Sequence, residues 1–122
     1  MSDCNVCVHF DGDCVEFVHK EIRIARKVYS CSECNRPISK ASRYELCKML
    51  SAGTWDTFRT CLVCAEIRAA FSCEGQTYGG IFWEYMEEMF DEITTGCLER
   101  MKTKEAKAYF RERWQKWKGL RA

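Results

Sequence analysis

The stretch Cys31-Ser-Glu-Cys34-Asn-Arg-Pro-Ile38 decides the fold together with Thr60-Cys61-Leu-Val-Cys64, and 26 residues separate Cys34 from Cys61. Each Cys-x-x-Cys pair can form a tight turn whose two thiolates point at one metal ion, while backbone amides donate hydrogen bonds to the sulfurs. Four thiolates complete a tetrahedron around Zn²⁺ and leave no open position. The spacing therefore predicts a structural zinc site. An iron ion, which has the same four-thiolate chemistry, stays open as an alternative.

The residues around the two pairs predict an α+β fold. Residues 15–30 are rich in β-branched side chains and indicate extended structure. Residues 42–60 are interrupted near Gly53, which is typical of a β-hairpin. From Cys61 the pattern becomes helical for about three turns, with Thr60 placed to cap the helix. A knuckle, a hairpin and a helix that supplies the second cysteine pair follow one another in the order of a treble-clef zinc finger.

Two amphipathic helices are expected after this unit. In residues 81–95 the apolar positions are spaced alternately one and three apart, with acids on the other face, and Gly96 ends the pattern. The last helix begins near Thr103 and carries an aromatic stripe that includes Phe110 and Trp114. We therefore divide the chain into a zinc-binding domain, residues 1–75, and a C-terminal helical hairpin, residues 76–122.

Charge is segregated along the chain although the formal net charge is only +1. Residues 74–95 carry six acids and no base, and residues 97–122 carry nine Lys/Arg against three acids. Opposite charges and two apolar stripes predict that the last helix docks antiparallel, or nearly so, on the acidic helix. The alternative is an arm that offers its Trp face to a partner, or to the same helix of a second chain in a homodimer.

The chain has ten cysteines, six of them outside the four-thiol site. A second zinc ion could be bound locally by Cys4, Cys7, Cys14 and His19, or at longer range with Cys73. These cysteines could also be small packed side chains without a metal. Cys47 and Cys97 are isolated in the sequence, and we expect both to be buried free thiols.

Several of these motifs resemble a group of small cysteine-rich proteins from bacteriophages and prophages, most of them uncharacterised. The run that carries the resemblance is Ala25-Arg26-Lys27, Cys31-Ser-Glu-Cys34-Asn-Arg-Pro-Ile38, Tyr44-Glu45, Trp55-Asp56 and Thr60-Cys61-Leu-Val-Cys64. The resemblance covers about residues 4–75 and implies a treble clef, zinc and a phage setting, but no activity. It also implies a second cysteine set: Cys4 and Cys7 match its first pair, Cys73 matches half of its second pair, and Gly75 stands where a partner is expected. Cys14 is the best substitute.

The sequence predicts no enzyme. Both histidines, His9 and His19, precede the first knuckle, so the histidines of a treble-clef nuclease are missing from its hairpin and helix. The sequence also has no Gly-rich phosphate loop and no hydrolase or metalloprotease motif. The first residues do not read as a signal peptide, and no apolar run is long enough to span a membrane. We therefore expect a cytoplasmic location, in which thiols are reduced and free to bind metal.

Binding remains as the expected function. One interpretation is a phage-encoded, non-enzymatic zinc module that binds and inhibits a host protein or protein–nucleic acid complex, such as a defence or transcription system. The other is a nucleic-acid-binding zinc finger that uses the basic segments 20–27 and 102–121. Neither interpretation needs a membrane.

Overall fold

The structure, a computed structural model, describes residues 8–9, 17–74 and 81–121. It is an α+β fold in which most of the strands of its small sheets precede the helices, as the sequence predicts. None of the described helices is long and apolar enough to cross a membrane. The elements in chain order are β1 (Val8–His9), β2 (Phe17–Ile24), β3 (Tyr29–Ser30), β4 (Pro37–Ile38), β5 (Arg43–Ser51), β6 (Thr54–Cys61), α1 (Leu62–Phe71), β7 (Ser72–Glu74), α2 (Ile81–Glu88), η1 (Phe90–Glu92), η2 (Thr95–Arg100) and α3 (Lys104–Arg121).

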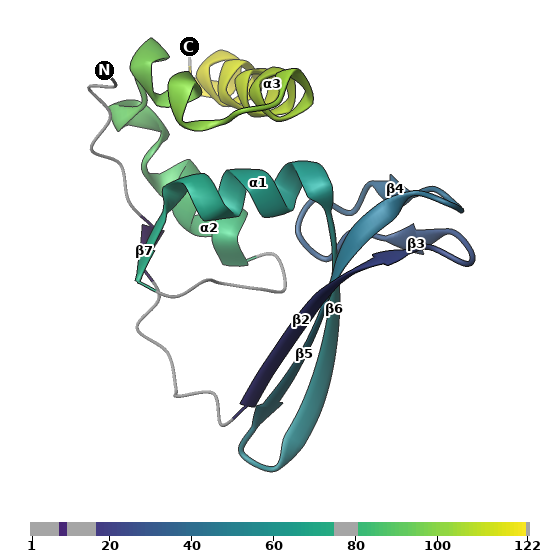
Figure 1. The fold of residues 1–122 in the computed structure, drawn as a ribbon. Coiled ribbons are helices and arrows are strands. Elements are labelled where there is room, and N and C mark those ends of the chain that lie inside the picture. The colour runs from purple at the N-terminus through teal and green to yellow at the C-terminus, as the bar shows by residue number, and fades with distance from the viewer. Residues whose placement is uncertain (1–7, 10–16, 75–80, 122) are drawn as a thin grey trace.

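The main sheet is antiparallel, in the order β2-β5-β6. Strands β5 and β6 form the predicted hairpin, and Ala52 and Gly53 turn the chain with positive φ angles of 50° and 77°. Glycine adopts this conformation without steric cost, which explains why the hairpin turns at this position. Figure 1 shows the lower half of the three strands extending away from the helices as an arm.

Helix α1 packs on one face of the sheet and α3 packs on α1 (Figure 1). Arg68 of α1 reaches down to Glu45 of β5 and Thr60 of β6, which are cross-strand neighbours in one row. One turn further along α1, the ring of Phe71 stacks on that of Phe110 of α3, with a centroid separation of 5.1 Å. The helix therefore joins the sheet to the C-terminal part of the chain.

Helix α3 is docked, and its aromatic stripe belongs to the core, as predicted. Phe110 is fully buried and Trp114 is only 8% exposed. The indole Nε1 of Trp114 donates a hydrogen bond to the carbonyl oxygen of Phe90 at 3.2 Å. Trp83 of α2 meets the ring of Tyr109 edge-on. The prediction that α3 docks mainly on the acidic helix is wrong, since its principal neighbour is α1, and buried side chains of α1, α2 and α3 share one core.

The acidic segment is not the single helix expected over residues 81–95. Helix α2 ends at Glu88 and two short 3₁₀ helices follow, with Thr94 between them in an extended conformation (φ −123°, ψ 169°). Ile93, Thr94 and Thr95 are β-branched and favour extended over helical backbone, in agreement with the extended conformations of Ile93 and Thr94. The hydrophobic period in the sequence continues because residues such as Phe90 and Ile93 are buried without being α-helical.

The start of α3 is fixed by a side chain from α1. The carboxylate of Glu66 accepts hydrogen bonds from the backbone amides of Lys102 and Thr103, at 2.6 and 3.0 Å. Thr103 Oγ1 in turn accepts from the amide of Ala106, which is an N-cap. Burial alone would raise the pKa of Glu66, but these hydrogen bonds outweigh burial and hold it below its usual value.

Candidate metal centre

The first cysteine pair lies in a tight turn between β3 and β4. These short strands pair antiparallel, with Tyr29 opposite Ile38. The turn is closed by hydrogen bonds from the amide of Asn35 to the carbonyl of Cys31 and from the amide of Cys31 to the carbonyl of Arg36, both 2.9 Å long. Asn35 has a positive φ of 63°, a conformation that asparagine tolerates better than most residues. The turn therefore has the geometry expected of a metal-binding knuckle.

The second pair lies where β6 passes directly into α1. Cys61 is the last residue of the strand, and Cys64 lies in the first turn of the helix. The backbone amide of Cys64 donates to Cys61 Sγ at 3.5 Å, so Cys61 occupies the capping position. The expected cap, Thr60, is wrong: its hydroxyl is buried and accepts a hydrogen bond from Arg68.

The four thiols form one cluster. The Sγ atoms of Cys31, Cys34, Cys61 and Cys64 all lie within 4.8 Å of one another. A zinc–sulfur bond of about 2.3 Å in a tetrahedron requires sulfur–sulfur separations of about 3.8 Å. The Sγ atoms of Cys34 and Cys61 are 3.9 Å apart, and Cys31 and Cys64 are buried. The donor set fits a tetrahedral metal ion such as Zn²⁺, and the cluster predicted from the sequence is confirmed as a candidate metal site.

Hydrogen-bond donors surround the sulfurs as a thiolate site requires. The amides of Glu33 and Cys61 donate to Cys31 Sγ at 3.4 and 3.3 Å. Arg36 donates through Nε to Cys34 Sγ at 3.4 Å. The hydrogen bond from the Cys31 thiol, helped by Arg36, holds the pKa of Cys34 far below its ordinary value. The hydrogen bonds with Cys31 and Cys34 raise the pKa of Cys64, because a second thiolate is unfavourable beside the first without a cation.

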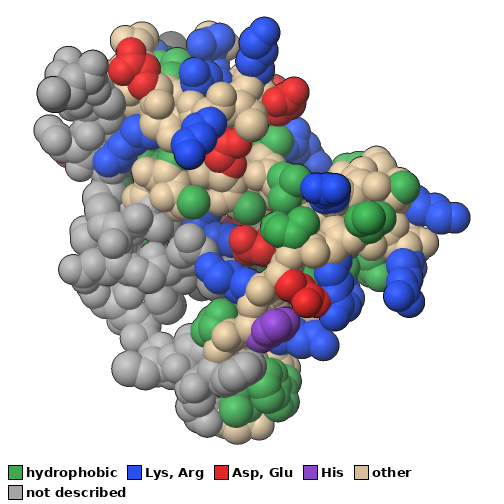
Figure 2. All heavy atoms as spheres, in the orientation of Figure 1, with side chains coloured by type: hydrophobic (Ala, Val, Ile, Leu, Met, Phe, Trp, Pro, Cys, Tyr) green, Lys and Arg blue, Asp and Glu red, His purple; other side chains and the backbone are tan. Residues whose placement is uncertain are grey.

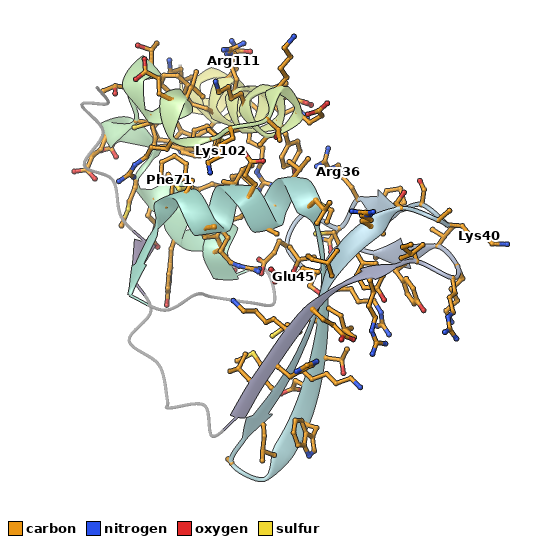
Figure 3. The ribbon with its side chains drawn as sticks, viewed as in Figure 1. Arg36, Lys40, Glu45, Phe71, Lys102 and Arg111 are labelled. Atoms are coloured by element: carbon orange, nitrogen blue, oxygen red, sulfur yellow. The ribbon has the colours of Figure 1, made fainter. Side chains whose placement is uncertain are left out.

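A buried ionic network lies directly behind the knuckle. The guanidinium of Arg68 is fully buried, lies 3.6 Å from the Glu33 carboxylate inside the first Cys-x-x-Cys, and is ion-paired with Glu45. Glu45, labelled in Figure 3, lies on the sheet below α1. Arg68 therefore ties the knuckle and the sheet to α1. This network was not predicted from the sequence, although a signal was present: Arg68 occupies the same helical stripe as Cys64, Ile67 and Phe71.

Most of the predicted ligands of the second metal site lie outside the residues that the structure describes. Cys4, Cys7 and Cys14 lie outside the described residues, and Cys73 lies in β7 without a described side chain. Strand β1 pairs in parallel with β7, so Val8, the residue after Cys7, lies opposite Ser72, the residue before Cys73. This pairing agrees with a metal site to which Cys7 and Cys73 both contribute, and that site stays a prediction. His19, the local alternative ligand, is exposed on β2 and contacts Glu21.

The two isolated cysteines differ from each other. Cys47 is buried on β5, has no disulfide bond and lies outside the cluster, in agreement with the prediction. Cys97 is buried as well, but it is disulfide-bonded, so the expected free thiol is wrong. A disulfide depends on proximity in the fold and leaves no spacing motif in the sequence. Disulfides are uncommon in the reducing cytosol, so this bond does not support the expected cytoplasmic location.

Comparisons with known proteins give no relative for this chain: no family model, curated protein or solved structure matches it. The resemblance to bacteriophage proteins gains no support from these comparisons.

Proposed function

We propose that this protein is a non-enzymatic, zinc-binding interaction module. Its four-thiol cluster binds one Zn²⁺ ion and stabilises a treble clef, and its surfaces bind a host protein or a protein–nucleic acid complex, whose activity the protein inhibits. The observation that carries the proposal is the closed donor set of Cys31, Cys34, Cys61 and Cys64, in which all four ligands are thiols within 4.8 Å of one another.

The cluster favours a structural role over catalysis. A catalytic zinc ion keeps an open position for water or substrate, whereas four thiolates fill the tetrahedron. The sulfurs also accept hydrogen bonds from backbone amides and from Arg36, which stabilise negative charge on thiolate ligands. Because a preformed site rarely exists in an unfolded chain, the energy of metal binding at such a site is largely energy of folding.

Exposed apolar side chains support a protein partner. Ile22, Ile24 and Val28 are each more than half exposed, and they lie close together in the sequence on and just after β2. Large apolar side chains gathered in one place on the surface mark interaction sites more often than isolated ones do. The acidic side chains of α2 and η1, including Glu84, Glu88 and Asp91, offer a second surface.

Charge on the zinc-binding part favours nucleic acid as a second candidate. Within residues 17–61, eight Lys/Arg side chains are exposed and Asp56 is the exposed acid. Figure 2 shows several of the Lys/Arg side chains at the end of the molecule formed by β3 and β4. Residues 20–27 rather than 102–121 would carry this binding, since Trp114 of α3 is buried and cannot stack on a base.

Zinc-dependent capture separates the two candidates. The tagged, zinc-loaded protein is incubated with host-cell lysate, with and without nuclease, and the retained proteins are compared with those retained by Cys34→Ser. A protein partner is retained after nuclease treatment and lost in the cysteine variant. Salt-sensitive retention on DNA or RNA, with no protein retained after nuclease, would contradict the first function and support the second.

A further inference from the structure

A groove runs along the outer strand of the sheet. It has a volume of about 820 Å³ and is lined by the consecutive residues 21–26 together with Tyr29 and Tyr44. Successive side chains of a strand point to opposite faces of its sheet. The groove is lined by the last four residues of β2 and by the two residues after them. It therefore runs along the edge of the strand and not over one face of the sheet.

The edge of β2 is open for pairing. In the sheet order β2-β5-β6, the strand is outermost, and among the strands that the structure describes it pairs only with β5. The other side of such a strand presents backbone N–H and C=O groups that can pair with another chain. Ile22 and Ile24, two residues apart on one face, are 57% and 61% exposed. This edge therefore combines open backbone groups with apolar side chains.

The charge of the edge selects what can pair with it. Residues 20–26 contain three Lys/Arg and one acid, Glu21, which is ion-paired with Arg23 and in contact with His19, so the segment keeps a net positive charge. Arg23 and Arg26 both line the groove. A segment with acidic residues opposite these arginines would be attracted, and a second copy of this basic strand would be repelled.

We propose that the outer edge of β2 binds an extended, acidic segment of a partner protein as an additional β-strand. The inference rests on the proposed interaction function and names the chemistry of the partner. Apolar residues of the segment pack on Ile22 and Ile24, its acids face Arg23 and Arg26, and its backbone supplies the hydrogen bonds. Nucleic acid would satisfy the arginines, but it would leave the two isoleucines and the backbone edge unused.

The test uses a randomised library of displayed linear peptides selected on the zinc-loaded full-length protein. The enriched peptides are expected to alternate apolar and acidic residues, and a central proline should abolish their binding because it removes a backbone donor. Arg23→Glu should weaken them at least about tenfold. Lys48→Glu is the matched control: it makes the same charge change on the central strand β5, outside the groove, and should change affinity little. Hydrogen exchange should slow at the amides of residues 21–25 when peptide binds.

Three results would overturn the inference while leaving zinc binding intact. One is that no peptide is enriched on the zinc-loaded protein beyond the level found on Arg23→Glu. A second is that single-stranded oligonucleotides, and not peptides, bind in an Arg23-dependent way. A third is that the protein forms a dimer that Ile22→Glu dissociates, which would assign the edge to a second copy of this chain. Absence of bound zinc would instead contradict the proposed function itself.

Discussion

The guanidinium of Arg36, labelled in Figure 3, lies over the ring of Tyr109, 3.6 Å from its centroid, while its Nε donates to Cys34 Sγ. One side chain thus joins the metal knuckle to α3. Arg113, one turn further along α3, donates to the Tyr109 hydroxyl and to Glu87 of α2. Burial, the largest influence on Tyr109, raises the pKa of its hydroxyl. The metal centre and the C-terminal helices are therefore in direct contact.

Loss of the contact between Arg36 and Tyr109 should make the metal ion dissociate faster. We expect Arg36→Ala to increase the rate of zinc transfer to a chelator about tenfold, because residues that hydrogen-bond to metal ligands commonly have effects of about 10- to 100-fold. Tyr109→Ala should have a smaller effect in the same direction, since it removes only the stacking on Arg36. Lys40→Ala, an exposed change in the turn after β4, serves as the control. Equal transfer rates for Arg36→Ala and Lys40→Ala would contradict this coupling.

Trp114 should be a core anchor and not a binding surface. Trp114→Ala is expected to lower the free energy of unfolding by about 3–5 kcal/mol, as for other buried aromatics, whereas Lys116→Ala on the exposed face should cost almost nothing. Chemical denaturation of both variants measures the difference. Because Trp55 is 57% exposed, acrylamide quenching is measured in a Trp55→Phe background. Ready quenching of the remaining tryptophans would show that α3 is not docked.

The buried network behind the knuckle should be essential for folding. Arg68→Met leaves the carboxylates of Glu33 and Glu45 without their buried cation, and breaking such a network typically costs about 3–5 kcal/mol. Arg111→Met, at an exposed position on α3, should change stability little. Adding Glu45→Leu to Arg68→Met should recover part of the loss, since one stranded charge is then removed. Thermal unfolding of the four proteins would contradict this account if Arg68→Met melted like the wild type.

Local signals in the sequence were sufficient for much of the fold. The hairpin at Gly53, helix α1, helix α3 and the four-thiol cluster each follow from a turn residue, a helical period or a ligand spacing. Residues 81–95 were harder, because buried Phe90 and Ile93 keep a helical period after α2 has ended at Glu88. The roles of Arg68, Arg36 and Cys97 depend on contacts between residues distant in sequence. Of these three, only Arg68 could have been recognised from the local sequence, because it is a cation in a helical stripe of apolar residues.

A second metal ion stays a prediction for the N-terminal cysteines. If Cys4, Cys7, Cys14 and Cys73 bind it, which requires that none of them forms the disulfide bond with Cys97, the wild type prepared under reducing conditions should contain two metal ions per chain, and Cys4→Ser should contain one. The pairing of β1 with β7 brings the residues next to Cys7 and Cys73 together, which is the physical basis of this expectation. Metal content is measured by elemental analysis of the purified proteins. A wild-type content of one ion, unchanged by Cys4→Ser, would mean that these cysteines do not bind metal.

The most direct test of the account is native mass spectrometry of the wild type beside Cys34→Ser, Cys61→Ser and Cys47→Ser. Cys47 is the matched control, because it is a buried thiol on β5 outside the cluster. We predict that each cluster variant loses one zinc ion relative to the wild type and that residues 31–71 unfold, as measured by hydrogen exchange, whereas Cys47→Ser keeps its zinc. A wild type that contains no zinc or iron and stays folded in chelator, or cluster variants with unchanged metal content, would contradict the four-thiol metal site.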